Sequence, residues 1–407
     1  MNLSSLPVTL ADIRQAVVRL GNSIYKSPCP YSLSLSRFCG CEIYCKLDHL
    51  QLTGSFKERG ARNRLLQLTE AQKKVGVITA SAGNHALAVA YHGQQLGINV
   101  TVIMPKYAPL VKITNCKSFG ANVMLDAENF AEAYQKAQQM AKENGLIFVP
   151  GFDDPAIIAG AGTVGLEILQ DVPDVDAVIV PVGGGGLISG IAVAIKSLRP
   201  EVKIIGVEPI NAPTMHTSLR AGKVVRVDTK PTLADGLAVA QAGELCFQIC
   251  KDLVDELQLV DEPRISKSVL RLLEMEKMVI EGAAAVPLAA VMPAPESLRG
   301  KKVVLVLCGG NIDVTVISKI IERGLAADGR LCRVTAFVSD RPGSLANLAG
   351  ILASTGASVK EIGHDRHFGP EDVGKVSISC ILETRDLQHI QQVHQVLLKA
   401  GIEFTAG

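Results

Sequence analysis

Short apolar segments alternate with amphipathic stretches of helix length over most of the chain. Between Lys57 and about Leu325, the amphipathic stretches include Ala108–Phe119 and Ala127–Asn144. This alternation predicts parallel sheets with helices on both faces, which is an α/β fold. The expected strands are Val75–Thr79, Asn99–Met104, Ala121–Leu125, Leu146–Val149, Asp176–Val182, Lys203–Glu208 and Lys302–Leu307.

The order of the elements changes after Gly324. We interpret residues 326–330 as a linker between a first domain over 1–325 and a second over 331–407. The second domain is expected to fold as strand, helix, strand, strand, helix and strand, an α+β, ferredoxin-like order. Its expected elements are Leu331–Val338, Ser344–Ser354, Ser358–Asp365, Gly374–Glu383, Asp386–Leu398 and Ile402–Phe404.

Composition is that of a globular protein without a charged or membrane-spanning character. Of the 407 residues, 48% are apolar and 20% charged, and the formal net charge is +1. Such a balance gives no basic field for nucleic acid, and no apolar run approaches the ~18 residues of a membrane span. No secretory signal is visible at the N-terminus, so we expect a cytoplasmic protein with no nucleic-acid or membrane partner.

Four of the ten cysteines, Cys29, Cys39, Cys41 and Cys45, lie close together in the sequence. A zinc site would need Cys-x-x-Cys pairs or histidines at matching spacing, and none follows. We therefore expect reduced cysteines that pack as small apolar residues.

Lys57 directly follows a Thr-Gly-Ser turn, at a point where a helix is expected to begin. The positive end of a helix and partial burial both disfavour a charged amine. A lysine there would lose its proton easily, and a neutral amine is a nucleophile for aldehydes. From these residues alone, a solvated lysine in the first turn of a helix is an equal alternative.

Two further motifs follow expected strands. Four consecutive glycines, Gly183–Gly186, suit neither helix nor strand, but they allow backbone N–H groups to converge on an anion. The pattern matches neither the nucleotide P-loop nor the dinucleotide-binding motif, so we interpret it as a phosphate-binding turn, with a plain glycine turn as the alternative. Ser81–His85 forms a similar junction. A nucleophilic lysine and a phosphate site together suggest pyridoxal phosphate.

The chain resembles the serine/threonine dehydratase family, of the tryptophan-synthase-β-like class of pyridoxal phosphate enzymes. The resemblance covers roughly residues 5 to 325 and rests on four ordered motifs. It implies a two-lobed parallel-sheet fold in which residues from about 50 to 150 form the smaller lobe, with the cofactor between the lobes. The motifs are Ser55–Lys57, Ser81–His85, Gly183–Leu187 and Leu307–Asn311.

The resemblance also implies the roles of individual residues. Lys57 would bind the cofactor and remove the α-proton of the substrate. Asn84 would contact the hydroxyl of the cofactor ring, Glu281 would line the site, and Cys308 would face the ring nitrogen. Further cofactor contacts are expected from Phe56, Gly183, Gly184, Gly185, Gly186 and Leu187, and substrate-carboxylate contacts from Ser81, Ala82, Gly83, Asn84 and His85.

Some relatives bind a structural cation, which here would involve Glu208 and the carbonyl of Ala212. The third ligand of the family, an aspartate, is replaced by Thr214. A simple strand-end carboxylate is the alternative interpretation of Glu208.

The second domain resembles an ACT domain, a dimerising module that senses amino acids. Its ligand loop would comprise Asp340, Pro342, Gly343, Ser344 and Leu345, where a helix N-terminus could receive an amino-acid carboxylate. The resemblance implies an amino-acid effector and a homodimer or homotetramer; a structural module without ligand is the alternative.

The expected activity is that of an L-threonine ammonia-lyase, which also acts on L-serine. A serine racemase, a 3-hydroxyaspartate dehydratase and an inert amino-acid sensor are the alternatives. Serine racemases that resemble this chain have a serine at the position of Ala82, as the acid on the face opposite the lysine. Because alanine cannot transfer a proton, the sequence favours dehydration.

Overall fold

The structure is a computed structural model that describes residues 6–108, 110–366 and 372–406. The chain divides into two compact units, Met1–Ile312 and Asp313–Gly407. The boundary at 325 and the linker over 326–330 stay a prediction, and helix α14 (Val314–Ala327) runs through the expected boundary. This helix starts where the Asp313 carboxylate accepts the Thr315 N–H at 2.8 Å. Its amphipathic pattern made it resemble another helix of the first domain.

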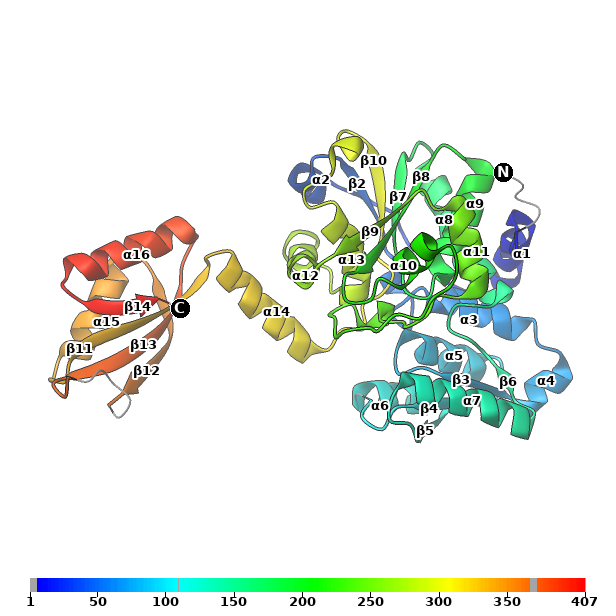
Figure 1. The fold of residues 1–407 in the computed structure, drawn as a ribbon, viewed down its shortest axis with the longest axis horizontal. Coiled ribbons are helices and arrows are strands. Elements are labelled where there is room, and N and C mark those ends of the chain that lie inside the picture. Colours follow the sequence, from blue (N-terminus) through cyan, green and yellow to red (C-terminus); the bar gives the residue numbers. More distant parts are fainter. Residues whose placement is uncertain (1–5, 109, 367–371, 407) are drawn as a thin grey trace. The chain divides into compact units, whose positions relative to one another are not determined.

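The larger lobe of the first unit is built on a six-stranded sheet in the order β1-β2-β10-β7-β8-β9 (Figure 1). Only β1 runs antiparallel to its neighbour, β2, and the other pairs are parallel. The strands span Tyr31–Ser32 (β1), Glu42–Lys46 (β2), Ala177–Pro181 (β7), Lys203–Pro209 (β8), Glu256–Val260 (β9) and Lys302–Val306 (β10).

Helices pack around this sheet. Helix α8 shows why the sequence folds locally as it does: Asp154 caps its first turn and Pro155 occupies the first helical position, where a missing N–H costs nothing. Every residue of α13 is buried, as its run of alanines and valine predicts. The helices are α1 (Leu10–Leu20), α2 (Leu33–Cys39), α8 (Pro155–Asp171), α9 (Gly186–Leu198), α10 (Thr214–Ala221), α11 (Glu244–Leu253), α12 (Glu262–Glu276) and α13 (Gly282–Ala290).

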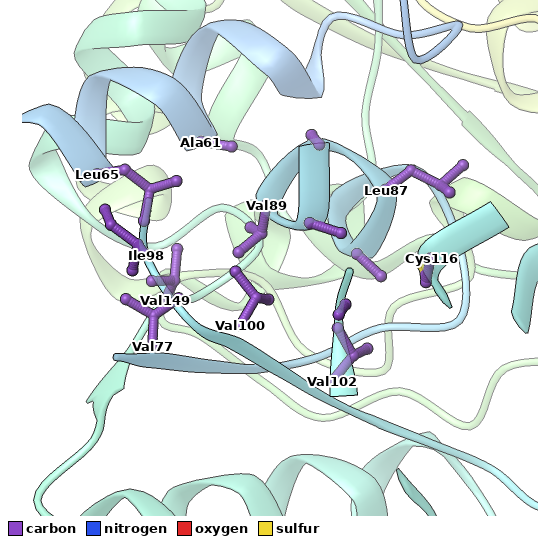
Figure 2. Packing of buried hydrophobic residues seen from close by; sticks show 14 of the residues in the cluster. Ala61, Leu65, Val77, Leu87, Val89, Ile98, Val100, Val102, Cys116 and Val149 are labelled. Atoms are coloured by element: carbon purple, nitrogen blue, oxygen red, sulfur yellow. The ribbon is translucent and has the colours of Figure 1, made fainter. Parts of the chain in front are cut away.

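The smaller lobe has a four-stranded, wholly parallel sheet in the order β5-β4-β3-β6. Figure 2 shows side chains of α3 and α5, including Leu65 and Val89, packed with Val77 and Val100 of the sheet. Helix α3 contacts both α5 and α8, so it joins the two lobes. The elements are α3 (Lys57–Leu66), α4 (Glu70–Val75), β3 (Val77–Ala80), α5 (Asn84–Gln95), β4 (Val100–Met104), α6 (Leu110–Ser118), β5 (Asn122–Leu125), α7 (Phe130–Asn144) and β6 (Ile147–Phe148).

The second unit contains an antiparallel sheet in the order β12-β13-β11-β14, which is the ferredoxin-like arrangement. Helices α15 and α16 contribute Leu348, Leu352, Val393 and Leu397 to its core. The expected fold class, α/β followed by an α+β ferredoxin-like unit, is confirmed. The elements after α14 are β11 (Leu331–Ser339), α15 (Ser344–Ser354), β12 (Ser358–Asp365), β13 (Lys375–Glu383), α16 (Leu387–Lys399) and β14 (Glu403–Ala406).

No helix among the described residues is long and apolar enough to cross a bilayer. All ten cysteines are free thiols, and eight of them are buried.

Candidate active site

Strand ends of both lobes of the first unit meet at a cavity of about 300 Å³. All the residues expected to contact cofactor or substrate line it. These are Phe56, Lys57, Ser81, Ala82, Gly83, Asn84, His85, Gly183, Gly184, Gly185, Gly186, Leu187, Glu281 and Cys308.

The turn that carries Lys57 is joined to the end of β10 by backbone hydrogen bonds. The Phe56 N–H donates to the Cys308 carbonyl at 3.0 Å, and the Gly310 N–H donates to the Gly54 carbonyl at 2.9 Å. Gly54 has φ +77°, and a Cβ there would lie 2.5 Å from Asn311 Oδ1, so only glycine fits. Two motifs about 250 residues apart in sequence thus form one rigid edge of the cavity.

The Lys57 amine is buried, and it donates a hydrogen bond of 2.6 Å to the Gly151 carbonyl. Burial lowers the pKa of Lys57 to about 8, although Cys308, Cys246 and Glu281 oppose the shift. A substantial fraction of the amine is therefore neutral near physiological pH. The amine can act as a nucleophile or a base, as expected from its place at a helix start.

A chain of amide and carboxylate hydrogen bonds crosses the floor of the cavity. Asn311 Nδ2 donates to Asn84 Oδ1 at 2.8 Å, and Asn84 Nδ2 donates to Glu281 Oε1 at 2.8 Å. Burial raises the pKa of Glu281 to about 7, while the bond from Asn84 opposes this shift. The Asn84 amide is thereby held in one orientation, with a second N–H and a second lone pair free for a ligand.

The Ser81–His85 loop ends at the start of α5. Gly83, the residue before α5, has no side chain that could accept a hydrogen bond from the helix. Within the described residues, the first N–H groups of α5 therefore remain available to an anion. His85 Nε2 lies 3.1 Å from the Val149 carbonyl, and burial together with Lys57 lowers the pKa of His85 to about 3. The imidazole is therefore neutral: Nε2 donates to Val149, and Nδ1 carries a lone pair.

The tetraglycine turn leads from β7 into α9, which starts without a side-chain cap among the described residues. A Cβ on Gly184 would lie 2.4 Å from the Phe152 ring, and Gly185 has φ +101°. Side chains would therefore fill this space, and glycines leave the backbone N–H groups bare. This arrangement fits the phosphate of pyridoxal phosphate, as the Lys57 amine fits its aldehyde.

The Cys308 thiol lies in the cavity wall at the end of β10. Burial, and next the carboxyl of Glu281, raise the pKa of Cys308 well above its usual range. The residue therefore stays a neutral thiol and cannot serve as an anionic partner for a ring nitrogen.

Several residues that line the cavity were not predicted. Phe152 and Gly151 follow β6 and line the cavity. Asn311, the last residue of the Leu307–Asn311 motif, does not line it but donates to Asn84, which does. Lys112 of α6 forms an ion pair of 3.3 Å with Asp235, across the two lobes. Only Asn311 had a sequence signal, its place directly after Cys308-Gly309-Gly310; the others reach the cavity through tertiary packing.

Glu208 and Ala212 lie outside this cavity. The Glu208 carboxylate caps α10, since its two oxygens accept the Met215 N–H at 2.7 Å and the His216 N–H at 2.8 Å. Within the part of the chain that the structure describes, no group of three or more His, Cys, Asp or Glu could hold a metal ion. The cation at Glu208 and Ala212 stays a prediction.

The expected effector loop lies in the second unit, between β11 and α15. Gly343 has φ +93° and is the first residue before α15, while Leu345 is 39% exposed. The Asp340 N–H donates to the Gly374 carbonyl at 2.9 Å, and its carboxylate pairs with Arg366 at 3.2 Å. The turn therefore has a defined shape, and its role stays a prediction.

Comparisons with known proteins agree with this site. A family model described as "Pyridoxal-phosphate dependent enzyme" matches residues 21–309. A Thermotoga maritima protein named L-threonine ammonia-lyase is 49% identical over 396 residues, which are 97% of this chain and 98% of the relative.

Two solved structures show the same fold. The processed form of threonine deaminase isoform 2 from Solanum lycopersicum has a TM-score of 0.73 and 37% identity, covering 77% of this chain and 86% of that chain. Serine racemase from Dictyostelium discoideum has a TM-score of 0.71 and 35% identity, covering 75% of this chain and 99% of that chain.

Proposed function

The chain belongs to the pyridoxal-phosphate-dependent enzyme family, and we propose that it is an L-threonine ammonia-lyase. Such an enzyme removes water from L-threonine and, after hydrolysis, releases 2-oxobutanoate and ammonia. The observation that carries the proposal is the buried Lys57 amine, which lines one cavity with the tetraglycine turn and Asn84. The family and the cofactor expected from the sequence are confirmed.

In this proposal, Lys57 holds the aldehyde of the cofactor, Gly183–Gly186 and Leu187 hold its phosphate, and Asn84 contacts its ring. When bound, pyridoxal phosphate supplies an electron-withdrawing ring that weakens the bond between the substrate α-carbon and its proton. The neutral thiol of Cys308 adds no negative charge beside that ring.

The substrate carboxylate binds at the start of α5, where the N–H groups after Gly83 and the positive end of the helix suit an anion. This contact fixes the α-carbon next to Lys57. Lys57 Nζ, in its neutral form, then takes the α-proton. The β-hydroxyl leaves as water when a proton returns to it from the protonated Lys57 Nζ, so the net reaction is an elimination.

Ala82 lines the cavity but has no proton to give. Racemisation would require a proton donor on the face of the substrate opposite Lys57, and Ala82 occupies the position at which the resemblance expects that donor in serine racemases. Elimination is therefore favoured over the racemase activity named in one structural relative.

L-Serine lacks one methyl group of L-threonine, a difference worth only about 1–3 kcal/mol in a binding pocket. We therefore propose that L-serine is a second substrate, giving pyruvate.

The ferredoxin-like second unit extends the proposal to regulation. We propose that it is an ACT domain whose loop Asp340–Leu345 binds an amino-acid effector, in a homodimer or homotetramer. The similarity to the Thermotoga maritima relative extends over 97% of the chain and so includes this unit. The free thiols support a cytoplasmic, reducing environment.

An assay of the purified, cofactor-loaded protein with L-threonine, L-serine and 3-hydroxyaspartate tests the activity. The expected result is 2-oxobutanoate and ammonia in equal amounts from L-threonine, with pyruvate from L-serine. A yellow protein that converts none of the three would contradict the enzyme and favour an amino-acid sensor.

A further inference from the structure

A buried glutamate, Glu58, follows the cofactor lysine directly and is not among the residues that line the cavity. Glu58 is 2% exposed, and its Oε1 accepts the backbone N–H of Thr53. The bond closes the turn between Thr53 and Lys57.

A buried histidine from the neighbouring helix reaches this carboxylate. His92 of α5 is fully buried, and its Nε2 lies 3.2 Å from Glu58 Oε2. The other ring nitrogen, Nδ1, lies 3.2 Å from Nη1 of Arg62. The ring therefore stands between Glu58 and Arg62, which are four residues apart on the same face of α3.

The chemistry of these three groups fixes the proton positions. A guanidinium can only donate, so His92 Nδ1 must carry a lone pair. The proton of a neutral imidazole then lies on Nε2 and is donated to Glu58, which is an anionic acceptor. Burial lowers the pKa of His92, which agrees with a neutral ring. We call the chain Arg62–His92–Glu58–Thr53 the His92 relay.

The relay ends on a residue whose backbone also bonds Asn311, next to the cavity. The Thr53 N–H binds Glu58, while the Thr53 carbonyl accepts Asn311 Nδ2 at 2.7 Å. Asn311 in turn bonds Asn84 at 2.8 Å. Thr53 therefore connects the contact between α3 and α5 to the turn that carries Lys57. Through Asn311, it also connects this contact to Asn84 in the cavity wall.

We propose that His92 is a positioning residue for Lys57: by separating Glu58 from Arg62, it keeps the Glu58 carboxylate on the Thr53 N–H and so holds the lysine turn in shape. This inference rests on the proposed role of Lys57 as the cofactor lysine. Without the ring, Glu58 and Arg62 pair directly as neighbours on α3, and the buried Thr53 N–H loses its acceptor.

Three variants of the full-length protein test the relay. In His92→Leu, we expect a roughly 10- to 100-fold lower kcat for L-threonine with KM changed less than about threefold, because a misplaced amine slows chemistry more than binding. His92→Gln offers an N–H to Glu58 and a carbonyl to Arg62, so it should recover activity to within about threefold of wild type. In Glu58→Gln, an amide N–H replaces the carboxylate oxygen that accepts the Nε2–H of His92, so two donors face each other. We expect the kcat of this variant to fall as far as that of His92→Leu.

The matched control is His389→Leu in the second unit. His389 is 2% exposed and uses both ring nitrogens, with Thr355 and Arg385 as partners. This variant should lose thermal stability, as His92→Leu does, but keep the wild-type kcat. A loss of kcat in both would mean that removing any buried histidine has this effect, and it would overturn the proposal.

A second readout separates this inference from the proposed function. The rate at which cofactor-free protein captures pyridoxal phosphate, followed by its absorbance, reports Lys57 whatever the substrate is. We expect slower capture in His92→Leu and Glu58→Gln, and near wild-type capture in His92→Gln. If the Glu58→Gln variant folds and captures the cofactor at the wild-type rate, the proposal is overturned. This outcome counts even if His92→Leu does not fold. If the variants show the expected capture rates but the wild-type protein does not convert L-threonine, only the proposed threonine activity is contradicted.

Discussion

The burial of Lys57 is the residue-level property on which the chemistry depends. Burial lowers the pKa of the amine to about 8, and the bond to the Gly151 carbonyl keeps its nitrogen in the cavity. The turn before Lys57 is bonded to Cys308, and the lysine amine is bonded to Gly151. A single side chain therefore acquires its reactivity from two distant segments of the sequence.

The pH dependence of cofactor capture should show this lowered pKa. Only the neutral amine attacks an aldehyde, and a lysine with a depressed pKa becomes neutral at a lower pH than one in water. We expect the capture rate to rise with pH up to about 8 and then to level off. Stopped-flow absorbance between pH 6 and pH 10 would measure it. A rate that still rises steeply near the pKa of about 10.4 of a free lysine would contradict the burial argument.

The identity of residue 82 should decide between elimination and racemisation. We expect the wild-type protein to form little D-serine from L-serine, since Ala82 has no proton to deliver. Ala82→Ser should gain D-serine formation, while Ala82→Gly, which also lacks a hydroxyl group, should not. Chiral chromatography of the products checks this. D-serine formation by the wild type as fast as deamination would exclude the assignment.

At this scale, residues in local motifs could be predicted and residues from distant segments could not. Lys57, Asn84 and Cys308 were recognisable because each lies in a local motif with defined chemistry. Phe152 contacts the tetraglycine turn only because its loop folds over Gly184. Nothing in its sequence neighbourhood carries that information.

At the scale of the elements, strand-to-helix junctions create the site. The tetraglycine turn between β7 and α9 and the Ser81–His85 loop between β3 and α5 both place a helix start at the cavity. Each helix directs its unpaired N–H groups toward the space where an anion would bind. The glycines are needed because side chains would occupy this space.

The Gly184→Ala substitution should weaken cofactor binding. Its Cβ would lie 2.4 Å from the Phe152 ring, so the ring or the turn must shift. We expect the dissociation constant of pyridoxal phosphate to rise roughly 10-fold or more, which corresponds to about 1.4 kcal/mol. Fluorescence titration of cofactor-free protein would measure it.

Gly350→Ala provides the control, since no atom lies within 4 Å of its added Cβ in α15. This change should leave cofactor affinity unchanged and stabilise the helix by about 0.5–1 kcal/mol. Equal affinities in the wild type and the Gly184 variant would contradict the phosphate-binding role.

All seven strands expected between residues 75 and 307 overlap observed ones, including β5 and β6 at the two edges of the smaller sheet. Strand β9 (Glu256–Val260) was not predicted: it lies at the sheet edge, and four of its five residues are half-buried or exposed. Strand β1 has only two residues, too few for a periodic pattern. Strand β2 (Glu42–Lys46) was not among the expected strands although it lies inside its sheet, so a place at the edge does not by itself decide whether a strand can be predicted.

At the scale of the whole molecule, two compact units combine a catalytic fold with a ferredoxin-like one. The order of elements in the second unit could be predicted, because its strands and helices are short and clearly separated. The division between the compact units lies ahead of α14, at Ile312 and Asp313, and α14 packs against β11. Membership of a helix in one unit depends on tertiary contacts.

An amino-acid effector should stabilise the full-length protein. A ligand that binds only the folded state raises the melting temperature with its concentration. We expect one or more amino acids, screened by thermal shift, to do so and to change the deamination rate. Gly343→Val should abolish both effects and keep the rate without effector, because φ +93° strains any other residue. No stabilisation by any amino acid would leave the second unit with a structural role.

Reduction of the cofactor-loaded protein with borohydride tests the central claim most directly. The hydride makes the bond between lysine and cofactor permanent, and mass spectrometry of the digested protein locates it. We predict a single pyridoxyl group on the peptide that contains Lys57, and none in Lys57→Ala. A label on another lysine, or no label in the wild type, would contradict the account.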